Sequence, residues 1–138
     1  PKPQNPVSEN NLKMKYVDEV HITSDNGIIK KMHFAGAGDC PEKGQEVTVN
    51  YEGRLEDGTV FDRSVDHGEP LKFHVGTGMV IEGWDKGIMA MKLGEKADLI
   101  IKSKYGYGDM GSPPKIPGGA TLHFTVELIQ IADRRPTR

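Results

Sequence analysis

Cysteine, tryptophan and long apolar runs are scarce in this chain of 138 residues. The single cysteine, Cys40, excludes an intramolecular disulfide and argues against a structural zinc site, which needs several thiolate or imidazole ligands. No apolar run approaches the about 20 residues that span a bilayer, so we expect no membrane segment. The formal net charge of −2 gives no electrostatic reason to expect a nucleic-acid partner.

The motifs of several common catalytic chemistries are also missing. There is no Walker loop, no Gly-x-Ser-x-Gly elbow and no calcium loop, and the five histidines are scattered. We therefore expect no metal ion and no cofactor. The start "PKPQNPVSENN" lacks the order of a secretory signal, and a lone cysteine fits a reducing compartment. These two features predict a cytoplasmic location, or a nuclear one.

Glycine and proline, in contrast, are abundant, with 17 and 9 residues, which indicates many turns and a strand-rich fold. The pairs Asn26-Gly27 and Asp57-Gly58 each predict a hairpin turn. Strands are predicted where apolar and polar residues alternate, in "QEVTVNYEGRL", "PLKFHVG", "EKADLIIKS" and "TLHFTVELIQIA". The one convincing helix is "GMVIEGWDKGIMAM", residues 78–91, whose apolar face carries Val80, Trp84, Ile88 and Met91.

The order of these elements predicts an α+β fold, an antiparallel five- to six-stranded sheet wrapped around one short α-helix. We expect a disordered segment at 1–14, one domain at 15–132 and a short tail at 133–138. Residues 104–120 form a long connection without periodicity, and such loops are usually functional. Two glycines in the predicted helix, Gly83 and Gly87, share a face where a strand can approach closely.

The aromatic and apolar inventory allows two interpretations. Ligand sites are mostly apolar clefts with a few placed polar groups, so this set can line a binding cleft. Packing in the core is the simpler alternative, and composition alone favours it. The set comprises Tyr51, Phe61, Phe73, Val80, Ile81, Trp84, Tyr107, Ile116 and Phe124, with Asp62 directly after Phe61.

Three motifs, read in order, shift the balance toward a cleft. "VTVNYEGRLEDGTVFD", "VIEGWDKGIMAMKLGE" and "YGYGDMGSPPKIPGGATLHFTVEL" together resemble the FKBP-type peptidyl-prolyl isomerases, the immunophilins that bind tacrolimus and rapamycin. The resemblance runs from about residue 28 to residue 131. "GSPPKIP" is particularly similar to the first domain of the large co-chaperone members of that family.

The resemblance implies a peptidyl-prolyl cis-trans isomerase and assigns roles residue by residue. Trp84 matches the floor of the proline pocket, Ile81 supplies a backbone N–H, and Ile116 is the contact of the long loop over the cleft. Five residues are expected to act in catalysis: Asp62, Tyr107, Trp84, Phe61 and Phe124. Seven are expected to bind the ligand: Tyr51, Leu71, Met79, Val80, Ile81, Gly106 and Ile116. The sequence departs from the best-known small member at several positions, among them Leu71, Met79, His67, Gly106, Ser112 and Lys115.

Such an enzyme needs neither a nucleophile nor a metal, only a site that fits the twisted amide better than either planar form. We hypothesise that Trp84, Phe61 and Phe124 hold the prolyl ring. Asp62, Tyr107 and the amide of Ile81 then fix the flanking carbonyl.

The implied partners are proline-containing peptides and proteins and the macrolides tacrolimus and rapamycin, with calcineurin as a partner of the drug-bound form. Nucleic acid and membranes are not expected as partners, and the protein is expected to be a monomer. The alternative is a non-catalytic FKBP-like module that binds client proteins, with a purely structural domain as a third interpretation. The intact set of aromatic residues with Asp62 favours the enzyme.

Overall fold

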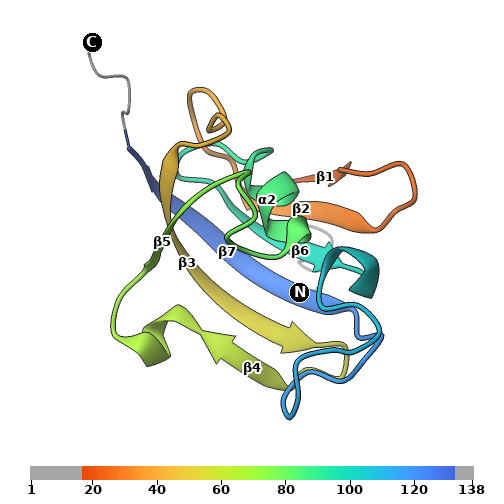
Figure 1. Ribbon diagram of the computed structural model, residues 1–138. Helices are drawn as coiled ribbons and strands as arrows, with labels where there is room; N and C mark the ends of the chain where they lie inside the picture. Colours follow the sequence, from red (N-terminus) through yellow and green to blue (C-terminus); the bar gives the residue numbers. More distant parts are fainter. Residues whose placement is uncertain (1–16, 133–138) are drawn as a thin grey trace, which may run out of the picture.

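The computed structural model describes residues 17–132, so the segments predicted at 1–14 and 133–138 lie outside the described residues. The described chain forms one antiparallel sheet of seven strands, with a single α-helix, α2 (Glu82–Ile88), against one face (Figure 1). The strands are β1 (Asp18–His21), β2 (Ile28–Phe34), β3 (Glu46–Leu55), β4 (Val60–Arg63), β5 (Leu71–His74), β6 (Lys96–Ile101) and β7 (Leu122–Ile131). This arrangement confirms the predicted α+β class with one short helix.

The sheet has seven strands where five or six were expected, because two short strands share one edge of β3. The strand order is β1-β2-β6-β7-β3-β4, and β5 also pairs with β3. β5 pairs with residues 46–49 of β3, and β4 pairs with residues 52–54. Between β4 and β5 the chain leaves the sheet in a 3-10 turn, η1 (Ser64–His67).

Apolar alternation places one face of the two longest strands in the core. β3 and β7 pair along nine positions, and on β7 every second residue from Leu122 to Leu128 is buried. Side chains at alternate positions of a strand point to opposite faces of a sheet. The residues between them, such as Thr125 and Glu127, therefore lie on the face directed away from α2.

The helix is shorter than the predicted span of 78–91. Ile81 has an extended backbone with ψ of 151°, so α2 begins at Glu82 and Val80 lies before it. The two glycines of α2 face β6. An added Cβ would lie 2.5 Å from Ile101 at Gly83 and 2.9 Å from Leu99 at Gly87, which confirms the close approach of a strand.

Both predicted hairpins form. In the turn between β1 and β2, Asn26 has a φ of 61°, a left-handed conformation that asparagine tolerates better than most residues. Gly58 takes the corresponding role between β3 and β4, with a φ of 92°. No helix within residues 17–132 is long and apolar enough to cross a membrane.

Candidate active site

A pocket of about 190 Å³ opens between the first turn of α2, the inner face of the sheet and the long loop after β6. It gathers ten of the twelve predicted site residues. Its lining consists of Tyr51, Phe61, Asp62, Leu71, Met79, Val80, Ile81, Trp84, Tyr107 and Phe124. Residues from six separate parts of the chain thus meet around one cavity.

The floor of this pocket is an aromatic cluster centred on Trp84, which is 4% exposed. The Trp84 ring lies 5.0 Å from the Tyr51 ring and 5.2 Å from the Phe124 ring, both edge to face. Phe61 continues the cluster at 5.5 Å from Phe124. Edge-to-face pairs at these distances are favourable beyond the burial of their area, so each ring holds the orientation of the next.

The Phe61 and Phe124 rings approach each other closely because the β3 residue that lies next to both is a glycine, Gly53. An added Cβ at Gly53 would lie 2.7 Å from both the Phe124 and the Phe61 ring. Only a residue without a side chain at this position of β3 leaves room for both rings. Phe73 supports Trp84 from a further side, with ring centroids 5.9 Å apart.

The polar edge of the pocket is organised by Asp62. The Tyr51 hydroxyl donates to one carboxylate oxygen at 2.9 Å, and Nε2 of His67 lies 2.8 Å from the other. Burial, followed by the hydrogen bond to Asp62, raises the pKa of Tyr51 above its usual range. The Tyr51 hydroxyl therefore stays protonated, and both Asp62 oxygens already have a partner.

Sequence reasoning did not identify Ser64, which is 4% exposed and fixes the backbone of this edge. Its hydroxyl accepts a hydrogen bond from the Tyr51 N–H at 3.1 Å and donates one to the Asn50 side chain at 3.0 Å. A serine immediately after a strand carries no sequence signal that would distinguish this role from a surface turn.

Two hydrogen-bond donors at the pocket have no acceptor among the described residues. The Tyr107 hydroxyl has no hydrogen-bond partner within residues 17–132, and burial followed by the charge of Asp62 raises the pKa of Tyr107. The Ile81 N–H, just before the first turn of α2, likewise donates to no described residue. Unused donors beside an apolar cavity suit a ligand that presents carbonyl oxygens.

Gly106 and Ile116 do not line the pocket. Ile116 is 5% exposed and belongs to the core cluster, where it pairs with Ser112 through two backbone hydrogen bonds that close the tip of the long loop. Beside it, the Lys115 ammonium reaches the Phe61 carbonyl at 3.4 Å. Gly106 ends the 3-10 turn η2 (Ser103–Tyr105), where an added Cβ would lie 3.2 Å from Leu122.

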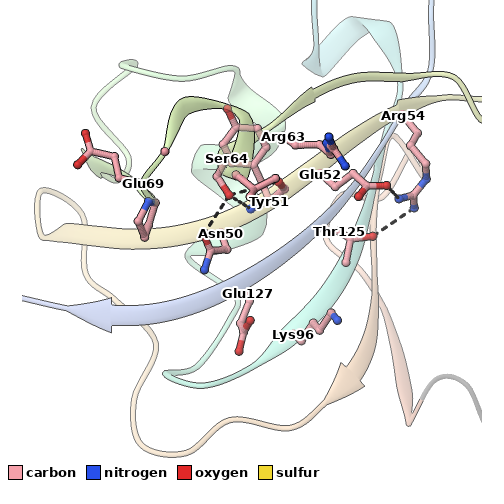
Figure 2. A pocket seen from close by; sticks show the side chains of 13 residues that line it. Asn50, Tyr51, Glu52, Arg54, Arg63, Ser64, Glu69, Lys96, Thr125 and Glu127 are labelled. Carbon is pink, nitrogen blue, oxygen red and sulfur yellow. Dashed lines mark hydrogen bonds and ion pairs between the residues drawn. The ribbon is translucent and has the colours of Figure 1, made fainter.

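A larger hollow of about 630 Å³ lies on the opposite face of the sheet, below the segment around η1 (Figure 2). Its polar side chains are largely engaged with one another. Arg54 bonds to Glu52 at 3.0 Å and to Thr125 at 3.2 Å, and Ser64 bonds to Asn50. The part of the chain that the structure describes contains no group of three or more metal-ligating side chains. The aromatic pocket is thus the candidate site.

Comparisons with known proteins agree with this geometry. Residues 38–129 match a family described as FKBP-type peptidyl-prolyl cis-trans isomerase. FK506-binding protein 1A of Aspergillus fumigatus is 53% identical over 110 residues, covering 79% of this chain and 98% of that protein. Peptidyl-prolyl cis-trans isomerase FKBP2 of Homo sapiens is 53% identical over 98 residues, 69% of each chain. The crystal structure of AtFKBP13 superposes with a TM-score of 0.75 at 38% identity, covering 80% of this chain and 97% of that one.

These similarities contradict the cytoplasmic or nuclear location expected from the sequence. They include FKBP2, which is a protein of the secretory pathway, and so point away from the cytoplasm. The expectation was wrong because a lone cysteine carries little information about the compartment. It has no intramolecular partner in either redox environment, so Cys40 fits both.

Proposed function

The chain belongs to the FKBP-type peptidyl-prolyl cis-trans isomerase family and is an enzyme of that kind, and on this premise we propose that catalysis takes place in the aromatic pocket. The proposal rests on one observation. Trp84, Phe124, Phe61 and Tyr51 form a continuous ring cluster that ends at the carboxylate of Asp62 in the same cavity.

The prolyl ring of the substrate stacks on the apolar floor over Trp84. Rotation about an X-Pro bond crosses a barrier of about 18–20 kcal/mol, because amide resonance has to be broken. The planar amide is more polar than the twisted one and is better solvated by water. An apolar cavity removes that solvation and thereby favours the twisted form, so the site binds the transition state more tightly than either planar state. An acceleration of about 10⁵ requires about 7 kcal/mol of such differential binding.

The carbonyl groups that flank the proline are held by the two open donors, the Tyr107 hydroxyl and the Ile81 N–H. The geometry of Asp62 favours a different role from the one first hypothesised for it. An ionised carboxylate only accepts hydrogen bonds, so it is unable to hold a carbonyl oxygen. Asp62 instead orients the Tyr51 ring through its hydroxyl, engages His67, and offers an acceptor to a peptide N–H.

Macrolides of the FK506 type occupy the same pocket and compete with peptides. Family members bind proline-containing substrates and FK506-type drugs in general, and FK506-binding protein 1A carries this property in its name. Two exposed side chains with large apolar surfaces, Met79 and Tyr107, line the pocket at its rim. With a macrolide bound, this rim forms a composite surface for calcineurin, and the protein without a drug is a monomer.

The test is an isomerisation assay on a Leu-Pro peptide, with and without rapamycin, together with the variant Phe61→Ala. We expect catalysis above the uncatalysed rate, inhibition by rapamycin, and loss of both activity and drug binding in Phe61→Ala. Activity that rapamycin leaves unchanged would show that the drug and the peptide do not share the pocket. Light scattering of the protein alone, and with rapamycin and calcineurin, measures its oligomeric state and the ternary complex.

A further inference from the structure

The turn between β1 and β2 is bonded to the start of the long loop through one carboxylate. Asp25 uses its two oxygens for different purposes. Oδ1 accepts from the Thr23 hydroxyl at 2.6 Å and from the Gly27 N–H at 2.9 Å, which organises the turn itself. Oδ2 accepts from the Tyr105 hydroxyl at 2.9 Å and from the Lys104 ammonium at 3.1 Å, which joins the turn to η2.

The contact between the turn and η2 is close as well as polar. The Tyr105 ring packs directly on Gly27, where an added Cβ would overlap the ring. The Gly27 carbonyl also accepts a hydrogen bond from the Lys102 N–H at 2.9 Å. Two segments about 80 residues apart in the chain therefore form one unit (Figure 1).

This unit is hydrogen-bonded to the backbone on both sides of Tyr107. Gly106 N–H and Gly108 N–H both donate to the Ser103 carbonyl, at 2.9 and 2.8 Å, so the backbone on either side of Tyr107 is bound to η2. The Tyr107 carbonyl accepts from Gly111 N–H at 3.1 Å. A shift of η2 is therefore expected to move the Tyr107 ring, which is 39% exposed.

We propose that Asp25 and Tyr105 are positioning residues, which hold η2 so that the Tyr107 hydroxyl stays at the edge of the pocket. Neither residue lines the pocket, although the Tyr105 ring packs against the core cluster. On this proposal they act on the reaction through Tyr107. The inference rests on the proposed role of Tyr107 as a donor to the substrate. Strong hydrogen bonding, first from Thr23 and then from Tyr105, keeps the pKa of Asp25 well below its usual range, so the carboxylate is ionised at neutral pH.

Because the two Asp25 oxygens bond to different partners, the bonds within the turn and the bonds to η2 can be removed by separate variants. Asp25→Asn with its carbonyl oxygen at the Oδ1 position keeps both bonds of the turn, but presents an NH₂ group to Lys104 and Tyr105. Thr23→Ala removes three hydrogen bonds of the turn, the one donated to Asp25 and those accepted from the Gly27 and Ile28 N–H groups, and leaves the hydrogen bonds of Asp25 to η2. Tyr105→Phe removes one bond of that contact and keeps the ring on Gly27. Asp57→Ala is the control for losing an aspartate from a turn, because Asp57 caps only the β3–β4 turn through Thr59.

The experiment measures kcat/KM for a Leu-Pro peptide in these variants, alone and combined with Tyr107→Ala, with thermal unfolding to verify folding. We expect Asp25→Asn and Tyr105→Phe to lower kcat/KM by about three- to tenfold, the effect of one or two weakened hydrogen bonds. In the Tyr107→Ala background the same substitutions should have less than about a twofold effect. Thr23→Ala and Asp57→Ala should stay within about twofold of the wild type in both backgrounds.

Two results overturn the inference. One is a kcat/KM within twofold of the wild type in Asp25→Asn and in Tyr105→Phe. The other is an equal loss with and without the Tyr107 side chain, which would mean that the residues act through general stability. If Tyr107→Ala alone leaves kcat/KM unchanged, the proposed role of Tyr107 fails first, and the two failures are thereby distinguished.

Discussion

At the level of single residues, the pocket combines side chains that are packed with side chains that are free to donate. Trp84 belongs to the first kind, because it is buried and contacts the rings of Tyr51, Phe73 and Phe124. Tyr107 belongs to the second kind, because its hydroxyl has no described partner and its ring is partly exposed. Substitutions at Tyr107 should therefore change mainly kcat/KM, whereas substitutions at Trp84 should also change the free energy of unfolding.

Removal of the Tyr107 hydroxyl should reduce activity without affecting stability. We expect Tyr107→Phe to lower kcat/KM by about five- to tenfold, the size of one hydrogen bond to a substrate carbonyl. The free energy of unfolding should change by less than about 0.5 kcal/mol, because no bond within the described protein is lost. Peptide isomerisation and urea unfolding measure the two effects. A variant with wild-type kcat/KM would remove the hydroxyl from the mechanism.

Truncation of Trp84 should change both quantities. Trp84→Ala leaves a cavity beside the rings of Tyr51, Phe73 and Phe124 and should reduce the free energy of unfolding by about 3–5 kcal/mol. Trp84→Phe keeps an aromatic floor, and we expect it to fold while binding rapamycin at least about tenfold more weakly, because the contact area with the ligand shrinks. Urea unfolding and calorimetric titration are the measurements. Wild-type drug affinity in Trp84→Phe would argue that the ring serves packing alone.

At the level of elements, two contacts keep α2 and β2 in place against β6. Gly83 and Gly87 let α2 approach Ile101 and Leu99. The second contact is a buried ion pair, in which the Lys30 ammonium of β2 lies 2.7 Å from Glu95, just before β6. The same ammonium donates to the Ala90 carbonyl at 2.7 Å, just after α2. A single cation thus connects the helix to the sheet.

An alanine at Gly83 should destabilise the fold although alanine favours helices. The intrinsic preference for alanine is about 1 kcal/mol, but the new Cβ would lie 2.5–2.8 Å from three atoms of Ile101. Overpacking of this kind costs about 1–3 kcal/mol. By urea unfolding, we expect Gly83→Ala to lower the free energy of unfolding. Gly87→Ala should lower it less, because the flexible Leu99 methyl groups can move. When Ile101 is also replaced by alanine, Gly83→Ala should no longer lower the free energy of unfolding relative to Ile101→Ala alone. A more stable Gly83→Ala would show that the helix has room to shift.

Breaking the buried ion pair should be more costly than replacing it. Lys30 is 4% exposed and Glu95 is 1% exposed, so Lys30→Met leaves a carboxylate without its counter-charge in the core. We expect a loss of about 3–5 kcal/mol in Lys30→Met, and a smaller loss in Lys30→Met combined with Glu95→Leu, because the stranded charge is gone. Guanidinium unfolding of the single and double variants gives both values. A double variant less stable than the single one would contradict this account.

At the level of the whole molecule, stability should fall in acid through carboxylates that are hydrogen-bonded only in the folded state. The pKa of Asp25 is lowered chiefly by Thr23 and Tyr105, that of Asp57 by the Thr59 N–H, and that of Asp66 by Arg63. A depressed pKa means that the folded state binds a proton less readily than the unfolded chain. The stabilisation is therefore complete above the unfolded pKa of about 3.9 and is lost as the pH falls toward the lower folded values.

The variant Asp25→Asn should separate one contribution to this acid sensitivity. We expect the difference in Tm between the wild type and Asp25→Asn to be largest above about pH 5 and to shrink below about pH 4, where Asp25 of the unfolded wild-type chain binds a proton while the folded state still resists protonation. Thermal unfolding between pH 7 and pH 2 provides the measurement. A difference that stays constant over this range would show that the ionisation of Asp25 does not contribute.

Much of the fold was predictable because it depends on local patterns, whereas the site residues were predicted from the resemblance of three motifs to a known family. Alternation along β3 and β7 identified both strands, and the Asn26-Gly27 and Asp57-Gly58 turns identified the hairpins. The helix was overestimated because Val80 and Met91 continue its apolar spacing, although the backbone at Ile81 is extended. Apolar spacing reports which side chains are buried, not where the helical hydrogen bonds begin.

The sequence by itself determined the identity of the elements, the glycines where they approach one another, and ten side chains that meet in the pocket. Only the tertiary structure decided that Ile116 is buried in the core, that β4 and β5 share an edge of β3, and that Asp25 holds the turn before Tyr107. The physical reason is sequence distance. Periodicity and turn preference act over a few residues, whereas a hydrogen bond between residues 25 and 105 forms only after the strands have paired.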